Sequence, residues 1–283
     1  MMKKLLLLLL CMVTVIISGC GDRFAKEKEA ISKAEKTAMS MEVPVLVKPD
    51  PSRQPPPTKE DYTRYQEGLN ILIAAENKML AEMRKSDAQI AALLGKAEKE
   101  EEKKDLRQFR DKVRQDRISF VKKISRGRLS GDTFIVGVGS TWQEVEMVYG
   151  KPASTGNQFP GTKQYIYKGL KFEDIIGGGV PSQERLKKWV SRTVQSVTMT
   201  GKNVTSDAGV TIGMTRDQVY KVLKTKYVKK NPRLTTNELK VERTNKPDGF
   251  DAVTQFAMEE TAPYNLFLEF KKGKLFRYIV AQN

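Results

Sequence analysis

Val138–Val145 reads VGSTWQEV and Ile212–Val219 reads IGMTRDQV, and these two stretches match each other at an offset of 74 residues. In each copy a short apolar run meets a glycine, and a threonine follows where it can cap a helix. Apolar residues then return four and seven positions after the threonine, which is helical spacing. The pattern predicts a strand that turns into a short helix, and it predicts this unit twice.

Strand-like runs follow each copy. The first copy is followed by Gln164–Lys168, Leu170–Asp174 and Trp189–Met199, and the second by Ala252–Met258, Asn265–Lys271 and Lys274–Val280. Tight turns at Lys168-Gly169 and Lys272-Gly273 join neighbouring runs, which predicts antiparallel meanders. Alternation of apolar and polar residues in Asn265–Lys271 predicts one sheet face that meets a helix. We expect an α+β fold with tandem strand–helix–meander units at 130–201 and 204–283.

A helical segment is expected before these units, over residues 59–128. Thr58 is a suitable N-cap, and apolar residues recur at helical spacing as far as Ile124. One helix of this length would leave its apolar stripe in water, so we predict an antiparallel hairpin. A break near Gly95 is favoured, with Ser86-Asp87 as the competing position, because Ser86 followed by Gln89 forms a capping box.

The amino terminus has the features of a secretory signal peptide over residues 1–19. Lys3 and Lys4 precede the apolar run Leu5–Ile17, which is too short to span a bilayer. Residues 20–58 are interpreted as a tether. Within it, Ala25–Met39 forms a short helix or stays mobile, and 42–58 holds six of the twelve prolines, which favours an extended spacer.

The signal ends in Ile17-Ser18-Gly19-Cys20, which resembles the bacterial lipobox. The resemblance implies a diacylglycerol thioether on Cys20, cleavage before this residue and acylation of the new amine with a fatty acid such as palmitate. Two or three acyl chains would anchor the protein stably. It would then be a lipoprotein of the cell membrane or the outer membrane, with its body outside the cytoplasm. The alternative is an ordinary cleaved signal in which Cys20 has no role.

The duplicated unit resembles the SmpA/OmlA (BamE) family of outer-membrane assembly lipoproteins. Gly213-Met214-Thr215 with Val219 matches the start of the family motif, and Gly150-Lys151-Pro152 matches its end. The tandem arrangement is also similar to the β-lactamase inhibitory protein, which pairs two such units. Lys224 replaces the closing glycine of the second copy, and the paired cysteines of the inhibitor are missing.

These resemblances imply a protein-binding or scaffold role in the cell envelope, with another envelope protein as the partner. A narrower alternative is an inhibitor of a cell-wall or β-lactam-cleaving enzyme.

Composition argues against an enzyme. The chain has no histidine, Cys11 leaves with the signal, and Cys20 is capped, so imidazole and thiol chemistry are removed and we expect no cofactor, metal or catalytic residue. Gly156–Lys163 has the wrong order for a phosphate loop. Glu173-Asp174 and Glu259-Glu260 are adjacent acids on strands, so the members of each pair point to opposite faces and cannot flank one bond.

Positive charge is concentrated in two segments of this chain of net charge +16. Arg107–Arg128 contains nine lysines and arginines, and Lys221–Arg233 contains six with no acid. The candidates for a basic surface are Arg114, Arg117, Lys122, Lys123, Lys226, Lys229 and Lys230. Outside the cytoplasm the relevant polyanions are anionic lipids or envelope polymers rather than nucleic acid. A membrane-surface polyanion-binding factor is therefore the alternative function, and charge that serves only solubility is the plainer explanation.

Trp142 is the first candidate for partner binding. It occupies a helical position that faces water in the usual arrangement, where the other copy has Arg216, and an exposed tryptophan suits an interface. The alternative is that Trp142 folds back over its own sheet or is covered by the helical hairpin. Phe159, Tyr165 and Tyr167 are weaker candidates of the same kind.

Overall fold

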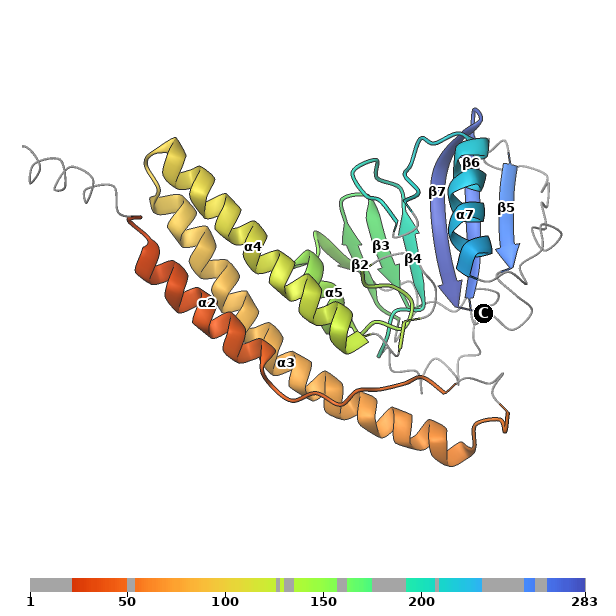
Figure 1. Ribbon diagram of the computed structural model, residues 1–283, viewed down its shortest axis with the longest axis horizontal. Coiled ribbons are helices and arrows are strands. Elements are labelled where there is room, and N and C mark those ends of the chain that lie inside the picture. The colour runs from red at the N-terminus through yellow and green to blue at the C-terminus, as the bar shows by residue number, and fades with distance from the viewer. Residues whose placement is uncertain are drawn as a thin grey trace, which may run out of the picture. The chain divides into compact units, whose positions relative to one another are not determined.

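The structure is a computed structural model that describes residues 22–49, 54–125, 128–129, 135–156, 162–174, 192–206, 209–230, 252–257 and 264–282 (Figure 1). The predicted signal peptide, Cys20 and Phe159 lie outside these residues. The chain divides into two compact units. The helical unit comprises Met1–Met41 and Lys78–Asp116, and the sheet unit comprises Glu42–Asn77 and Arg117–Asn283.

The helical unit packs α2 (Ala25–Met39) with the second part of α3 (Lys59–Lys96) and the first part of α4 (Glu100–Ser125). Its core consists of Phe24, Ile31, Ile90, Leu93, Ala97, Leu106 and Val113. Lys28 forms an ion pair with Asp22 and another with Asp105, at 2.6 Å from the Asp105 carboxylate. Of the two alternatives for Ala25–Met39, the structure therefore contains the helix, and it is a packed one.

The break between the long helices lies near Gly95, as predicted. The helix α3 ends at Lys96 and α4 begins at Glu100, whereas Ser86 is buried inside α3. Gly95 itself is still helical, and the break follows it. At the other end of α3, the Thr58 hydroxyl accepts the Asp61 backbone N–H at 3.2 Å, which confirms Thr58 as the N-cap. Among the described residues, no helix is both long enough and apolar enough to cross a membrane.

The sheet unit contains one antiparallel sheet of seven strands in the order β1-β2-β3-β4-β7-β6-β5. The strands are β1 (Ser154–Gly156), β2 (Gln164–Tyr167), β3 (Leu170–Glu173), β4 (Ser196–Met199), β5 (Ala252–Ala257), β6 (Tyr264–Lys271) and β7 (Lys274–Gln282). The predicted runs contain these strands, although the run Trp189–Met199 is a strand only over Ser196–Met199 among the described residues. The strands join into a continuous sheet through the pairing of β4 with β7.

The two matching sequence stretches fold in the same way, but the strand predicted before each short helix is wrong. Among the described residues these positions form turns with isolated bridges, Thr141 with Thr193 and Thr215 with Lys274. Gly139 donates to the Val194 carbonyl at 2.9 Å and Val194 donates to Ser140 at 2.8 Å. In the second copy Gly213 donates to Leu275 at 2.9 Å and Leu275 donates to Met214 at 2.8 Å. Both threonines that follow these turns cap the next helix through a reciprocal capping box with the residue three positions on.

The repeated hydrogen bonds define which strand residues correspond. Val194 corresponds to Leu275, and at the same offset Thr198 corresponds to Ile279. Thr198 and Ile279 are also each other's partners across β4 and β7. A local twofold axis therefore passes between these two residues, and the two halves of the sheet are related by it.

Both short helices lie on one face of this sheet. The helix α5 (Trp142–Tyr149) packs Tyr149 against Phe172 of β3, with ring centroids 5.5 Å apart. The helix α7 (Arg216–Lys230) contacts β7 and lies across the second half of the sheet (Figure 1). The core between helices and sheet includes Val145, Val197, Leu268 and Val280, all less than 1% exposed. The opposite sheet face is thus separate from this core.

Candidate functional site

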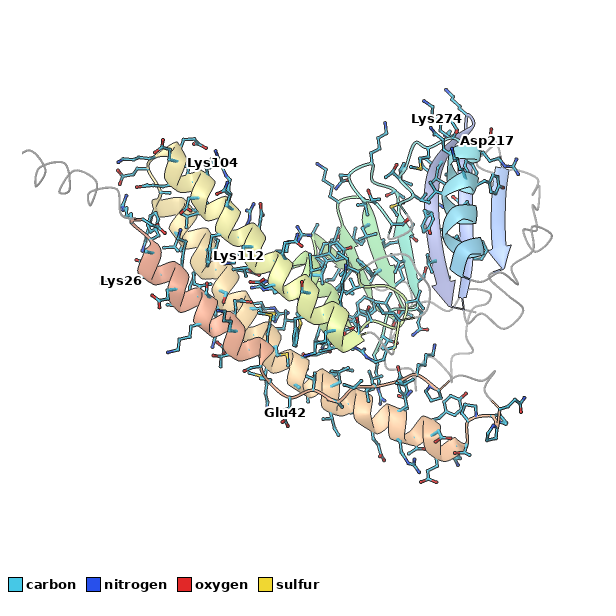
Figure 2. All side chains as sticks on the ribbon, viewed as in Figure 1. Lys26, Glu42, Lys104, Lys112, Asp217 and Lys274 are labelled. Atoms are coloured by element: carbon cyan, nitrogen blue, oxygen red, sulfur yellow. The ribbon has the colours of Figure 1, made fainter. Side chains whose placement is uncertain are left out.

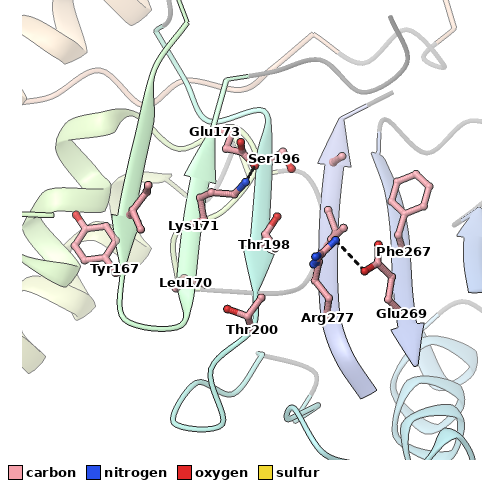
Figure 3. A pocket seen from close by; sticks show the side chains of 13 residues that line it. Tyr167, Leu170, Lys171, Glu173, Ser196, Thr198, Thr200, Phe267, Glu269 and Arg277 are labelled. Carbon is pink, nitrogen blue, oxygen red and sulfur yellow. Dashed lines mark ion pairs between the residues drawn. The ribbon is translucent and has the colours of Figure 1, made fainter. Parts of the chain in front are cut away.

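The face of the sheet opposite to this core carries a hollow with a volume of about 680 Å³. Its lining comes from both halves of the sheet, on β2, β3, β4, β6 and β7 (Figure 3). Because the strand registers align Lys171 with Thr198 and Thr198 with Ile279, alternate residues of neighbouring strands meet on this face. The twofold axis between Thr198 and Ile279 passes through the hollow.

Two ion pairs lie in the hollow, one in each half. Lys171 Nζ is 2.9 Å from Glu173 Oε2, and Arg277 Nη1 is 2.9 Å from Glu269 Oε2. The two carboxylates are 10% and 14% exposed, whereas Lys171 and Arg277 are 39% and 35% exposed. The hollow therefore presents its cations outward and keeps its carboxylates at the floor.

Glu173 and Glu269 occupy corresponding positions about the local axis. Glu173 pairs with Ser196, whose counterpart is Arg277, and Arg277 pairs with Glu269. Three strand spacings and four residues along the strands separate the two acids, which amounts to roughly 20 Å. Glycoside hydrolysis needs two carboxyl groups within about 10 Å of each other. These two acids are too far apart for that chemistry.

Uncharged side chains form the rest of the hollow. Ser196, Thr198 and Thr200 supply hydroxyl groups along β4, and Ile166, Ile279 and Phe267 add apolar surface. Such a mixture of satisfied ion pairs, hydroxyls and apolar groups suits a protruding segment of another molecule. Among the described residues, no cluster of histidine, cysteine and acidic side chains is arranged to hold a metal ion.

Trp142 does not present an exposed ring. It is 2% exposed, and its ring packs edge-on against Tyr165 of β2 with centroids 4.9 Å apart. Lys163 Nζ lies 5.0 Å from the centroid of the same ring. Of the two alternatives for Trp142, the structure contains the one in which the ring folds back over its own sheet, so an exposed hot spot at this position is wrong.

Tyr165 and Tyr167 differ in their surroundings. Tyr165 is 9% exposed and lies beneath Trp142. Tyr167 is half-buried at the edge of the hollow, and its hydroxyl donates to the Gly150 carbonyl at 2.9 Å. Burial raises the pKa of Tyr167, and the nearby Glu146 adds to this effect. The Tyr167 ring packs against Tyr149 of α5 and against Phe172, on the face covered by helices, so Tyr167 borders the hollow only at its edge.

The basic candidates do not all lie on the surface. Arg114, Lys122 and Lys123 are exposed, whereas Arg117 is 4% exposed and is not a surface residue. Arg117 lies on the packed face of α4, and the run of charges in the sequence does not show which face of the helix each residue occupies. The side chains of Lys226, Lys229 and Lys230 lie outside the described residues.

A second polar cluster is buried in the sheet unit and was not predicted. The Arg128 guanidinium pairs with Glu144 of α5, and both side chains are fully buried. Glu76 of α3 accepts a hydrogen bond from the Thr141 hydroxyl at 2.6 Å. Burial, together with the adjacent Glu144, raises the pKa of Glu76 to about 9. Glu76 therefore keeps its proton at neutral pH and lies beside the Arg128–Glu144 pair.

Gly139 allows Arg128 to take this position. Its φ is +96°, and a Cβ at Gly139 would lie 2.2 Å from the Arg128 carbonyl oxygen. The cluster joins α3, the segment after α4 and the N-terminus of α5, so its role is to fix these elements together. Arg128, Glu144 and Glu76 are each 1% exposed or less, so none of these ionisable side chains is open to solvent.

The hollow could not be predicted from the sequence, because its residues are distributed over five strands. In the sequence, Glu173 stands out only as one of two adjacent acids. The structure directs the side chains of Glu173 and Asp174 differently. Glu173 lies in the hollow, whereas Asp174 accepts the Lys163 backbone N–H at 2.7 Å. One feature of the sequence does indicate this face. Phe267 and Glu269 alternate with the apolar residues of the predicted strand, so both point away from the core.

Comparisons with known proteins do not identify a family for this chain. No protein-family model matches the chain, and no curated protein matches it. Among solved structures, an extracellular protein containing an SCP domain from Bacillus anthracis str. Ames matches with a TM-score of 0.32 and 14% sequence identity. The match covers 52% of this chain and 44% of that one. At this TM-score the two chains share too little geometry for the likeness to bear on fold or function.

Proposed function

We propose that the protein is a non-enzymatic, lipid-anchored envelope lipoprotein that binds another envelope protein in the hollow of its sheet. The observation that carries this proposal is the hollow itself, which spans both halves of one sheet on the face away from the helices. A volume of about 680 Å³ with an open mouth suits a loop or a side-chain cluster of a partner.

The chemistry of the hollow supports binding rather than catalysis. Each of its carboxylates is held by its own cation, and the two acids lie roughly 20 Å apart. The hydroxyls on β4 provide directional hydrogen bonds, and Phe267 provides an aromatic contact of the kind that dominates interface energies.

The repeated turn and capping box support the relationship to tandem SmpA/OmlA-like units. Gly213-Met214-Thr215 contributes the turn, its hydrogen bond with Leu275, and the helix cap. In this proposal the two units are copies of one module that pair β4 with β7 to make a shared binding face. The lipid anchor at Cys20 is the further part of the proposal and rests on the lipobox.

Site-specific photo-crosslinking in the native organism tests the binding face. A photoreactive residue at position 267, inside the hollow, should give an adduct with one defined protein. The same residue at position 62 is the matched control, because Tyr62 is an aromatic residue of the sheet unit that is 42% exposed outside the hollow. An adduct from position 62 with none from position 267 would contradict the proposal.

Affinity for the protein so identified gives the second measurement. Phe267→Ala should weaken binding by roughly 10-fold or more, as expected for a central aromatic contact, and Tyr62→Ala should leave it unchanged. Equal effects of the two substitutions would place the binding surface elsewhere.

A further inference from the structure

One end of the sheet gathers lysines from three separate turns. Leu170, Met199, Tyr278 and Leu268 form one row across β3, β4, β7 and β6. The turn at 168–169 and the segment 200–204 lie directly beyond this row, and the turn at 271–274 lies at the same end of the sheet, about three residues further along β6 and β7. These three segments carry Lys168, Lys202, Lys271, Lys272 and Lys274, which we name the lysine end.

The lysine end is exposed, and its lysines form no ion pair with any described side chain. All five lysines are exposed, and the three segments contain no aspartate or glutamate. Among the described side chains, no carboxylate lies within ion-pair distance of any of the five. Asp217, in the first turn of α7, is the acid seen near Lys274 (Figure 2). The cations therefore act on whatever approaches this end from solvent.

Backbone hydrogen bonds hold two of the three segments together, and the third is a tight turn. The Thr200 and Gly201 N–H groups donate to the Gly169 carbonyl at 2.9 and 3.0 Å, which joins the first two. Lys272 and Gly273 both have positive φ, at 52° and 70°, as in the tight hairpin turn that suits twisted strands. From β3 to β6 the lysine end spans three strand spacings, or about 14 Å. It is therefore wider than one small anion needs.

An exposed phenylalanine accompanies these lysines. Glu269 pairs with Arg277 and Phe270 pairs with Leu275, so Phe276 is the extra residue of a β-bulge. A bulge redirects a side chain, and Phe276 is 41% exposed. Its ring centroid lies 6.0 Å from Lys271 Nζ and 5.7 Å from Arg277 Cζ. The aromatic ring is thus presented among cations at the same end of the sheet.

We propose that the lysine end, with Phe276, is a docking surface for an anionic phospholipid membrane. Lysines near an anionic leaflet are attracted to its headgroups, and aromatic rings are favoured at the boundary between headgroups and acyl chains. A soluble polyanion would use the lysines but would gain nothing from an exposed phenyl ring. This surface adjoins the hollow at Thr200 and Arg277, but none of its five lysines lines the hollow, so it adds a contact beyond the proposed binding of a protein.

Vesicle co-sedimentation tests the docking surface. The predicted mature chain, residues 20–283, carries Cys20→Ser so that no acyl chain contributes to binding. It should bind vesicles that contain phosphatidylserine, should not bind pure phosphatidylcholine, and should lose binding steeply with salt. Lys202→Glu with Lys274→Glu should weaken binding by roughly 30-fold or more, because each lysine contributes about fivefold.

The matched control is Lys104→Glu with Lys112→Glu, which changes net charge equally at exposed positions of α4 outside the predicted basic surface. This variant should bind as the parent chain does, and thermal unfolding should show that all variants are folded. Phe276→Ala should weaken vesicle binding several-fold without any change of charge. Equal losses in the two lysine variants would reduce the effect to net charge and overturn the proposal. No binding to phosphatidylserine, or tighter binding to soluble polyphosphate that is unaffected by Phe276→Ala, would also overturn it.

Discussion

Glu76 is a carboxyl group that the fold keeps protonated. It lies on α3 without exposure to solvent, accepts the Thr141 hydroxyl at 2.6 Å, and lies next to the buried pair of Arg128 and Glu144. A second negative charge here would face Glu144 in a region of low dielectric, so the proton stays. The opposite charges of Arg128 and Glu144 balance each other only while Glu76 is protonated and neutral.

Glu76→Gln tests this arrangement. Burial raises the pKa of Glu76 from 4.5 to about 9. Between these pH values the folded chain holds a proton that the unfolded chain has released, so the unfolding free energy of the parent falls as pH rises. The amide keeps the bond to Thr141 without titrating. The variant should therefore gain stability over the parent as pH rises, by at most about 1.4 kcal/mol per pH unit.

Chemical denaturation at several pH values measures the difference. Glu67→Gln removes an exposed carboxyl from the same helix and is the control for loss of a charge. A difference between Glu76→Gln and the parent that stays constant from pH 5 to pH 8 would show that Glu76 is ionised in the folded chain.

At the scale of elements, the turn before each short helix is the repeated device. Gly139 and Gly213 have nearly equal φ, at 96° and 98°, and each donates a hydrogen bond to the strand that follows in its own half. They differ in surroundings, because a Cβ on Gly139 would meet the Arg128 carbonyl oxygen at 2.2 Å, whereas a Cβ on Gly213 would meet nothing within 4 Å.

Gly139→Ala and Gly213→Ala therefore form a matched pair. Both should lose stability through a backbone conformation that side chains disfavour, by about 1–3 kcal/mol. Gly139→Ala should lose more, because the Arg128 backbone must also move and the buried ion pair with it. Unfolding free energies of the two variants give the comparison. Equal losses would mean that the strain lies in the backbone alone.

Local patterns were enough to predict many of the elements. Thr58 and the glycine–threonine turns located helix starts, since caps and turns depend on neighbouring residues. Short strand β1 was missed, because Ser154, Thr155 and Gly156 have no apolar alternation. The depth of Trp142 and Arg117, and the gathering of residues around the hollow, depend on which strands pair across the chain. No local pattern contains that information.

At the scale of the whole molecule, attachment to a membrane is the proposal that most affects how the protein works. The helix α2 begins at Ala25, and Phe24 is already in the core of the helical unit. Few residues separate Cys20 from packed structure, so an acyl anchor there would hold the helical unit close to the bilayer. The extended chain that could act as a spacer lies after α2 rather than before it.

Cys20→Ser in the native organism tests the anchor. Each buried CH₂ group of an acyl chain contributes about 0.8 kcal/mol to membrane binding. Two or three whole chains therefore contribute far more than surface charges do. In high salt, which screens the lysine end, the variant should move from the membrane fraction to the soluble fraction. Mass spectrometry of the parent should show a lipid on the amino-terminal residue of the mature chain. Membrane retention of the variant in high salt would remove Cys20 from the proposal.

The pairing of Thr198 with Ile279 has one more consequence. A shorter protein with only one of the two modules would leave that strand as a bare edge, ready to pair with the same strand of a second copy. Such a protein would assemble as a symmetric dimer whose abundance depends on its concentration. In one chain the pairing of β4 with β7 does not depend on protein concentration. The two halves can also carry different residues at corresponding positions, as Arg277 and its counterpart Ser196 do.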